Sequence, residues 1–235
     1  MFDNLWERFY EEFITGEGLA LMEKGVYITL KVSVVALALG IIVGIIMALM
    51  KISTTRKPVL KIFVKAMNII ANLYITIFRG TPVVVQLLLA YFGILGPLEV
   101  EPLYVAFLVL GLNSGAYVAE IIRGGIMSVD KGQLEAGRSL GLSYITTMTY
   151  IIIPQAIKNI LPALGNELIA LIKETSVVGF ISVFDMTRAA RSVISTTYDA
   201  FVPYIVLALT YLVIVLVATS LVDALERRMR KSDIR

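Results

Sequence analysis

The sequence predicts an all-α polytopic membrane protein with about five transmembrane helices. Of its 235 residues, 58% are hydrophobic and only 17% are charged, and the mean hydropathy of +0.84 is far above that of a soluble domain. The basic residues are gathered in a few segments, whose positions predict an outer N-terminus and a cytoplasmic C-terminus. We expect the spans over residues 32–50, 59–94, 103–122, from Pro154 toward Lys173, and over 200–222.

Composition also excludes several classes of function. The chain has no cysteine and no histidine, so we expect no disulfide, no metal site, and neither a thiol nucleophile nor the commonest general base. The net charge of +3 gives no indication of a nucleic-acid partner. No Gly-Lys dipeptide occurs, so the chain lacks a phosphate-binding P-loop. We therefore expect no catalytic residue and no cofactor in this chain.

The transmembrane domain is expected over residues 25–225, between two different terminal segments. Residues 1–24 interleave aromatic and charged side chains, which indicates an amphipathic lead-in at the membrane interface. Residues 226–235 form a basic tail that places the C-terminus in the cytoplasm. The end of the first span is also followed by basic residues, namely Lys51, Arg56, Lys57, Lys61 and Lys65.

Two pairs of glycines have the spacing of a helix-packing face. Gly40 and Gly44 lie in the first span, and Gly111 and Gly115 lie in the third. A glycine every fourth residue lets another helix approach closely in a membrane. We expect all four to serve packing.

The second span begins with a polar stripe and contains a proline. The stripe repeats at steps of three and four residues, which places its side chains on one face of a helix that lies at the interface or lines a wet cleft. Pro82 then loosens the helix and frees a backbone carbonyl. Thr81 and Gln86, on either side of it, are candidate substrate contacts. The stripe consists of Lys61, Lys65, Asn68, Asn72, Thr76 and Arg79.

In the third span Asn113, Tyr117 and Glu120 share one helix face, because they are four and three residues apart. An ionisable group at the centre of a span costs about 2.5–3.5 kcal/mol unless it faces protein or water. Glu120 therefore either forms a structural ion pair, with Arg123 or Arg79, or contacts a substrate. All three residues are candidates for the substrate site.

The fourth span is expected to begin at Pro154, the helix position that proline favours, and to be broken at Pro162. Asn166 and Glu167 follow this break, and broken helices with polar residues at mid-depth are where transporters place binding sites. Glu167 is the leading candidate to contact an amine or guanidinium, with a buried structural pair as the alternative. Residues 177–197 are too interrupted by charge to span and are expected on the outer side.

Between the third and fourth spans, residues 128–153 form a polar cytoplasmic loop. We expect two short helices joined by a turn. Asp130 caps the first helix, with Gln133 as its capping-box partner. Gly141 takes the left-handed position that ends this helix, and Ser143 caps the second.

The tip of this loop is expected to dock another protein. Leu140 and Leu142 flank the turn and present apolar side chains in a polar loop. The second helix should stop or kink near Ile153, because Pro154 follows it.

At these residues the chain resembles the membrane-spanning subunits of bacterial ABC importers. Their signature is E-A-A, three residues, G, nine residues, I, one residue, L-P. The chain has Glu135, Ala136 and Gly137, then Gly141, then Ile-Ile-Ile-Pro at residues 151–154. Glycine replaces the third motif residue and isoleucine replaces leucine. The stretches RGTPVVVQ, YVAEIIRGGI and LGNELIALIKETS resemble the polar amino acid uptake branch of that family.

The resemblance implies a type I importer permease in a bacterial inner membrane. Two permease chains, with a homodimer favoured, would assemble with two cytoplasmic ATPases that bind ATP and Mg²⁺. An extracellular amino-acid-binding protein would deliver the substrate. Coupling to the ATPase would occur through residues 133–156, with Glu135, Ala136, Gly137, Arg138, Leu140, Gly141 and Leu142 as the contacting residues.

Within this family the charges favour a basic amino acid, namely arginine, lysine or histidine. Glu120, Glu167 and Glu174 supply carboxylates along the expected path. Arg79, Arg123 and Lys173 cancel some of this charge, so glutamine or glutamate stays open as the alternative. The substrate-site candidates are Glu167, Asn166, Asn113, Tyr117, Gln86, Thr81 and Glu120.

Two other classes of function have weaker support. An ion-driven secondary carrier is compatible with the hydropathy, but no inverted repeat is visible, and such a carrier needs no docking loop. An intramembrane serine protease is suggested only by Asn113–Ser114–Gly115, and without histidine there is no imidazole base.

Overall fold

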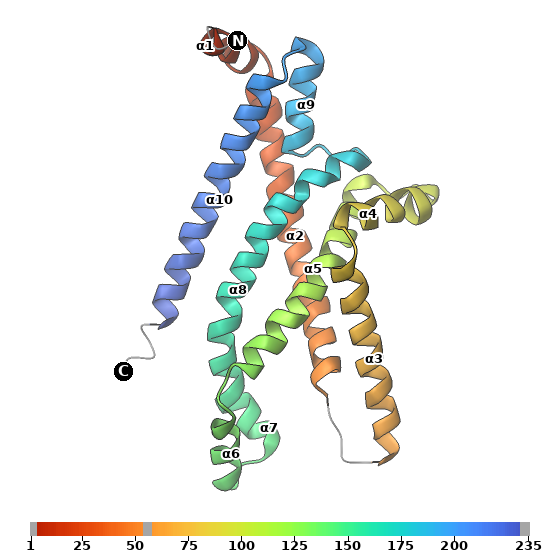
Figure 1. The fold of residues 1–235 in the computed structure, drawn as a ribbon, viewed down its shortest axis with the longest axis vertical. Coiled ribbons are helices and arrows are strands. Elements are labelled where there is room, and N and C mark those ends of the chain that lie inside the picture. The colour runs from red at the N-terminus through yellow and green to blue at the C-terminus, as the bar shows by residue number, and fades with distance from the viewer. Residues whose placement is uncertain (1–3, 54–57, 231–235) are drawn as a thin grey trace.

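The computed structural model describes residues 4–53 and 58–230, and within these ranges every regular element is a helix (Figure 1). The basic residues Arg56, Lys57, Lys231 and Arg235 lie outside the described residues. In chain order the elements are α1 (Leu5–Phe9), the π-helix η1 (Tyr10–Thr15), α2 (Gly18–Ile52), α3 (Pro58–Gly80), α4 (Val83–Leu88), the π-helix η2 (Leu89–Leu95), the 3₁₀-helix η3 (Gly96–Leu98), α5 (Pro102–Met127), α6 (Lys131–Ser139), α7 (Tyr144–Thr147), the π-helix η4 (Met148–Ile152), α8 (Ile153–Glu174), the 3₁₀-helix η5 (Thr175–Ile181), α9 (Met186–Thr197) and α10 (Phe201–Arg230).

α2 and α5 lie against each other and form the centre of the bundle (Figure 1). A Cβ atom on Gly40 would lie 2.9 Å from the Cβ of Ser114, and one on Gly44 would lie 2.5 Å from Cγ1 of Val118. These distances leave no room for a side chain, so the predicted packing role of the glycines is confirmed. Two glycines of α5 approach α2 in the same way, Gly111 at Leu39 and Gly115 at Val43.

The largest buried apolar cluster lies where α4 and η5 cover α2 and α5. α9 packs on α2 beside it, because Gly25 lets the chain approach closely: a Cβ there would lie 2.9 Å from the Cα of Met186. At 12 residues α9 is too short to cross a membrane, in agreement with the expectation for this segment. The cluster includes Val32, Leu87, Leu110, Leu171 and Ile181.

The expected second span is shorter than predicted. α3 ends at Gly80, and after Thr81 and Pro82 the chain turns into α4 and η2, which run across the bundle (Figure 1). Pro82 is the N-cap of α4 in an extended conformation. The prediction that the helix continues through this proline is therefore wrong, because a residue before proline is disfavoured in the α conformation.

The fourth long helix is also not as predicted. α8 passes through Pro162 without a break, so the expectation of a broken helix at this position is wrong. The missing N–H of Pro162 removes one helical hydrogen bond, and the remaining bonds and neighbours of α8 keep the helix intact.

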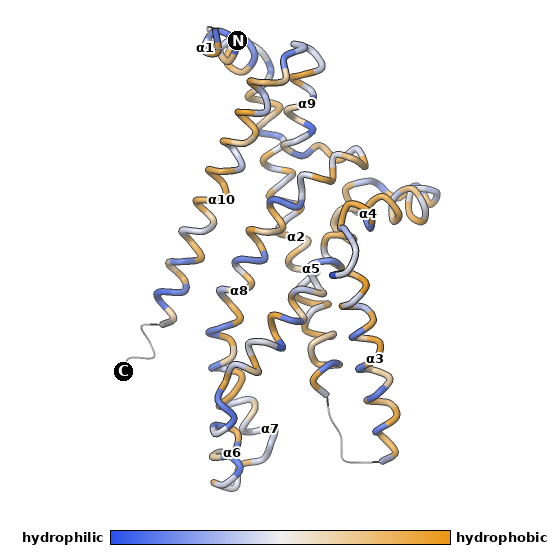
Figure 2. The backbone as a smooth tube through the Cα atoms, viewed as in Figure 1, coloured by the Kyte–Doolittle hydropathy of each residue, from blue (hydrophilic) through white to orange (hydrophobic). Residues whose placement is uncertain are grey.

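In the part of the chain that the structure describes, four helices are long and apolar enough to cross a membrane: α2, α3, α5 and α10. α8 corresponds to the fourth of the five predicted spans, and its 22 residues include Lys158, Glu167, Lys173 and Glu174. Polar residues also gather on α6 and at the end of α10 (Figure 2). α2 begins at Gly18 and so extends into the predicted lead-in.

Candidate functional site

The corner between α5 and α8 has the local geometry that its sequence predicts. Asp130 is the N-cap of α6, and its Oδ1 accepts a hydrogen bond of 2.6 Å from the N–H of Gly132. Gly141 has φ +82°, the left-handed conformation that glycine adopts without strain. The N–H of Leu142 donates to the carbonyl of Gly137 over 3.1 Å, which closes the Schellman motif at the end of α6.

The capping of the second helix is confirmed, whereas the capping box of the first is not. The Oγ of Ser143 accepts a 3.0 Å hydrogen bond from the N–H of Thr146 and so caps α7. Gln133 bonds to Asp130 through backbone atoms, N–H to carbonyl over 3.0 Å. Among the described residues its side chain gives no reciprocal bond to the cap.

The glycine that departs from the family signature has a steric reason. Gly137 is buried against the start of the second helix, where a Cβ would lie 2.6 Å from Cγ2 of Thr147. Thr147 is itself fully buried, and its hydroxyl donates to the carbonyl of Ser143 over 2.9 Å. Glycine at this motif position therefore lets α6 lie directly on the end of α7.

The exposed tip of the corner is apolar, but it differs in part from the expectation. Leu140 is 82% exposed, whereas Leu142 is half-buried and the guanidinium of Arg138 donates to its carbonyl over 2.7 Å. Tyr144 and Ile145 are exposed and extend the apolar tip. Sequence reasoning missed these two, although their place directly after the N-cap Ser143 was a signal that they lie at the tip. Glu135 and Ala136 are exposed as well.

The corner is joined to α8 by a helix of a different pitch. The expected stop near Ile153 is absent, because the chain passes from α7 through the π-helix η4 into α8. Pro154 lies in the first turn of α8, and because the backbone before it is also helical, its missing N–H removes one hydrogen bond to the preceding turn. The corner and α8 are therefore joined by continuous helical backbone.

In the middle of the bundle, three of the substrate-site candidates form one hydrogen-bonded network. The amide of Gln86 donates to the carbonyl of Phe78 over 2.9 Å and to the hydroxyl of Thr81 over 2.8 Å. Asn113, which is 3% exposed, donates to the same Phe78 carbonyl and to Oε1 of Gln86, both over 3.0 Å. The network ties the turn between α3 and α4 to α5. It thereby satisfies the carbonyl group that the proline frees.

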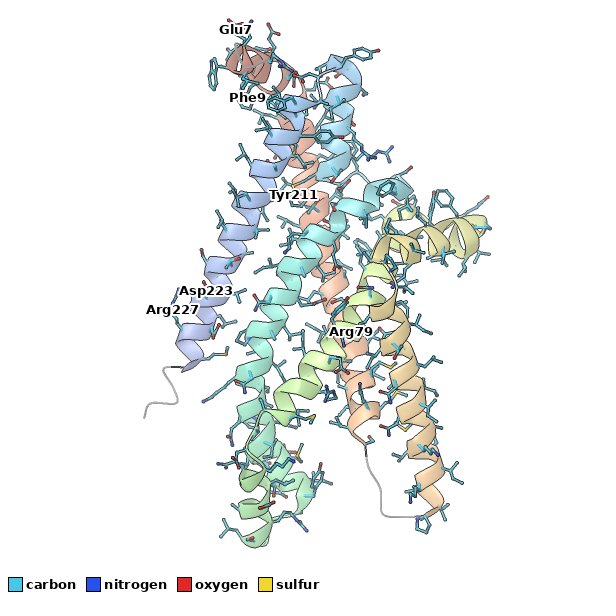
Figure 3. The ribbon with its side chains drawn as sticks, in the orientation of Figure 1. Glu7, Phe9, Arg79, Tyr211, Asp223 and Arg227 are labelled. Atoms are coloured by element: carbon cyan, nitrogen blue, oxygen red, sulfur yellow. The ribbon has the colours of Figure 1, made fainter. Side chains whose placement is uncertain are left out.

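Tyr117 lies one turn further along α5 and is covered by a cation. The guanidinium carbon of Arg79 is 5.2 Å from the centre of the Tyr117 ring, which is a cation–π contact. Figure 3 shows Arg79 in the middle of the molecule, at the end of α3 and beside α5. Arg79 is exposed, so its charge is accessible from the space beside these helices.

Glu120 forms the structural ion pair that was one of its two expected roles. Its carboxylate accepts from Nζ of Lys51 over 2.5 Å and from the guanidinium of Arg123 over 2.7 Å. Lys51, at the end of α2, was not anticipated as a partner, because the two residues are 69 positions apart. The charge of Glu120 is compensated within the chain.

Glu167 and Asn166 point in different directions, so the structure does not bring these two candidates together. The half-buried carboxylate of Glu167 accepts a 2.7 Å hydrogen bond from Ser114 of α5. Asn166 instead lines a cleft between α8 and α10. Consecutive residues of a helix are rotated by a little more than a quarter turn, which explains the separation.

Comparison with known proteins gives one family. A model described as "Binding-protein-dependent transport system inner membrane component" matches residues 40–231. The arginine transport system permease protein ArtQ of Bacillus subtilis is 42% identical over 212 residues, which are 89% of this chain and 93% of ArtQ. The glutamine transport system permease protein GlnP of Escherichia coli K12 is 36% identical and covers 90% of this chain and 94% of its own.

Solved structures agree with this result. The crystal structure of an amino acid ABC transporter with histidines superposes with a TM-score of 0.82 at 44% identity, over 89% of this chain and 94% of that one. An inward-facing MetNI methionine ABC transporter gives a TM-score of 0.75 at 17% identity, over 89% and 96% of the two chains. The second likeness shows the shared fold.

Proposed function

This chain belongs to the family of binding-protein-dependent transport system inner membrane components, and from that premise we propose that it carries a basic amino acid across the membrane. It is the permease subunit of an ABC amino acid importer. Arginine, lysine and histidine are the basic substrates to be tested, and glutamine is the alternative.

The observation that carries the proposal is the environment of Glu167. Its carboxylate is half-buried near the middle of α8, and among the described residues it accepts a hydrogen bond from the neutral hydroxyl of Ser114. Glu174 lies two turns later on the same side of α8 and is also half-buried. Charges in such places are costly unless they are compensated. A cationic substrate would compensate them, whereas Glu120 is already paired.

The named relatives support the same choice and also define the alternative. The relative with 42% identity is named for arginine, and the one with 36% identity is named for glutamine. A glutamine side chain would find amide partners in the network of Asn113 and Gln86. Uptake of arginine should need the carboxylate of Glu167, whereas uptake of glutamine should not.

The test is uptake by the assembled transporter in proteoliposomes, with labelled L-arginine and labelled L-glutamine. Glu167→Gln should lower arginine uptake about tenfold or more, the effect of losing one buried charge contact of about 1.5–3 kcal/mol. Glu101→Gln removes the same charge from an exposed loop and should leave uptake unchanged. Unaltered arginine uptake and selectivity in Glu167→Gln would contradict the basic-substrate assignment.

We further propose that the corner of α6 and α7 docks a cytoplasmic ATPase, one on each of two identical permease chains. The exposed apolar tip around Leu140, with Glu135 and Arg138 beside it, supports this role. ATP and Mg²⁺ would be bound by the ATPases, and a binding protein would supply the amino acid from outside. Purification of the complex from its native membrane, followed by mass spectrometry, would give the partners and their ratio.

An outer N-terminus and a cytoplasmic corner complete the proposal, and the chain is well suited to testing them. It contains no cysteine, so single cysteines report their own side of the membrane. Leu140→Cys and Tyr198→Cys replace residues that are 82% and 92% exposed at opposite ends of the bundle. An impermeant thiol reagent applied to intact cells should label Tyr198→Cys and spare Leu140→Cys.

A further inference from the structure

The half of α3 that begins at Pro58 is hardly covered by the rest of the chain. The buried residues of α3, Ala71 and Ile75, both lie in its second half. In the most apolar stretch of α3 only 11% of the residues are buried inside the chain, against 61% for α5. Figure 1 shows the free half of α3 at the same end of the molecule as the corner of α6 and α7. The surroundings of this half are therefore provided by lipid or by another molecule.

Two basic side chains of this half share one face of the helix. Lys61 and Lys65 are four residues apart and exposed, and neither forms an ion pair with any residue that the structure describes. The amide of Asn68, one turn later, donates to the carbonyl of Ser53 at the end of α2 over 3.3 Å. This bond fixes how α3 is turned about its own axis. The two lysines are therefore held in one row, about 6 Å apart along the axis.

The sequence around this row carries positive charge only. From residue 24 to residue 98 every charged residue is a lysine or an arginine. Two copies of α3 would bring their lysines together if they met on this face, and like charges repel. The charge of the row instead matches an anionic partner.

The lysine row also borders an exposed apolar face. At 3.6 residues per turn the buried Ala71 and Ile75 lie to one side of the row. Ile62 and Ile69, which are 79% and 56% exposed, lie about a quarter turn to its other side. A molecule with a negative headgroup and apolar chains would cover the row and this face together.

The length of α3 places both lysines near the headgroups of one leaflet. Its 23 residues extend over about 34 Å, close to the ~30 Å of a hydrocarbon core. Lys61 and Lys65 lie about 5 Å and 11 Å from the first residue of the helix. Long basic side chains near a helix end extend to the interface, so both ammonium groups can reach the same layer of phosphates.

We propose that Lys61 and Lys65 bind the phosphate group of an anionic phospholipid, whose acyl chains lie on the apolar face beside Ile62 and Ile69. A zwitterionic phospholipid is bound less well, because its own ammonium group compensates its phosphate. Each lysine near a membrane surface contributes about a fivefold preference for anionic lipid. The inference goes beyond the proposed function, since it is independent of which amino acid is carried.

The experiment measures which lipid lies beside α3 in the complete transporter. The chain contains no cysteine, so Ile62→Cys gives it a single site for a fluorescent label, with a cysteine-free form of the ATPase as partner. Brominated phosphatidylglycerol should be about fivefold or more preferred over brominated phosphatidylcholine as the quencher of this label. The preference should fall as the salt concentration rises.

Variants of the lysines test whether the preference depends on this row. Lys61→Gln with Lys65→Gln should abolish it, whereas Lys61→Arg with Lys65→Arg should keep it, because the charge stays in place. The matched control is Lys24→Gln with Lys31→Gln, which removes two exposed basic groups from α2 in the other half of the bundle. This control should keep the preference as well.

The proposal is overturned by equal quenching from the two lipids, or by a preference that persists in the double glutamine variant of Lys61 and Lys65. Crosslinking of Ile62→Cys between two permease chains would overturn it too, because the second chain would then cover this face. None of these measurements requires transport. A failure of amino acid uptake would reject the proposed function alone, and a failure of lipid selection would reject this inference alone.

Discussion

α5 and α10 are both long enough to cross a membrane, but they have opposite surroundings. In its most apolar stretch 61% of the residues of α5 are buried inside the chain, against none for α10. The more apolar helix is the less buried one, with a mean hydropathy of 2.7 against 1.7. In a membrane the outer face of a protein contacts lipid, so small and polar residues mark the interior. The facing sides of α2 and α5 are therefore buried against each other, and we call these two helices the closed pair. The surfaces of α10 and of the corner formed by α6 and α7 are exposed and can contact partners.

The largest effect is expected from a substitution inside the closed pair. Gly44→Val would place its side chain where a Cβ already lies 2.5 Å from Val118, and overpacking of this kind costs about 1–3 kcal/mol or more. Ala208→Val on the exposed side of α10 should change stability by no more than about 0.5 kcal/mol. Thermal unfolding in detergent measures the stability of both variants. An equal loss of stability in the two would contradict the contrast between the closed pair and the exposed side of α10.

The corner should show the opposite behaviour, a loss of transport without a loss of fold. Gly141 has no heavy atom within 4 Å of its Cβ position, and aspartate tolerates the left-handed conformation better than most residues. Gly141→Asp and Glu135→Lys should therefore melt close to the native protein but lower uptake about tenfold or more, because charge is altered at the docking tip. Gly124→Ala, at another exposed glycine with open space around it, is the control.

Full uptake in both corner variants would remove the docking assignment. Low uptake together with a lowered melting temperature would instead mean that the corner belongs to the closed part of the molecule.

A smaller effect is expected where α2 and α5 are joined by charge. Glu120→Gln leaves Lys51 and Arg123 without their carboxylate, and a hydrogen bond to a charged group contributes about 1.5–3 kcal/mol, less where the groups are partly exposed. We expect a lower melting temperature and an unchanged preference between arginine and glutamine. A change in substrate selectivity without a change in melting temperature would indicate that Glu120 contacts the substrate.

The smallest effect concerns the packing of the N-terminal helices on the start of α10. Burial, the hydrogen bond with Asp199 and the charge of Asp199 raise the pKa of Glu12 from 4.5 to about 7, although Arg8 opposes this. The folded state thus binds the proton more tightly than the unfolded chain, so the packing is strongest below pH 4.5 and weakens as the pH rises through about 7.

The only tryptophan of the chain reports this change. Trp6 is 72% exposed and its ring centre lies 5.7 Å from that of Phe9. Its fluorescence should titrate near pH 7 in the native protein and in Glu11→Gln, where the altered side chain is exposed. Glu12→Gln should abolish the transition. A transition that persists in Glu12→Gln would assign it to another group.

Sequence patterns predicted the local features of the fold well. The caps Asp130 and Ser143 and the left-handed Gly141 depend on neighbours a few residues away, so short motifs determine them. The glycine faces of α2 and α5 were predictable for a related reason, because the spacing of small residues shows where a helix can be approached.

The parts that depend on distant contacts were not predictable. Lys51 reaches Glu120 across 69 positions, and no local signal links them. Thr81 and Pro82 end α3 instead of loosening it, because the network of Gln86 and Asn113 holds the turn. Pro162 was expected to break α8, which stays helical. The structure joins Gln86, Thr81 and Asn113 in one network and pairs Glu120 with Lys51 and Arg123, and the role of these residues in substrate binding stays a prediction.

The contact between Lys51 and Glu120 has a consequence for how the protein is made. α2 is the most apolar of the long helices, with a mean hydropathy of 2.9, and it emerges from the ribosome before α5. α5 carries Asn113 and Glu120, which disfavour insertion of an isolated helix. The partner of this carboxylate is already present when α5 is synthesised, because Lys51 belongs to the earlier helix α2. α10, synthesised last, has a mean hydropathy of 2.7 in its most apolar stretch, and none of that stretch is buried inside the chain.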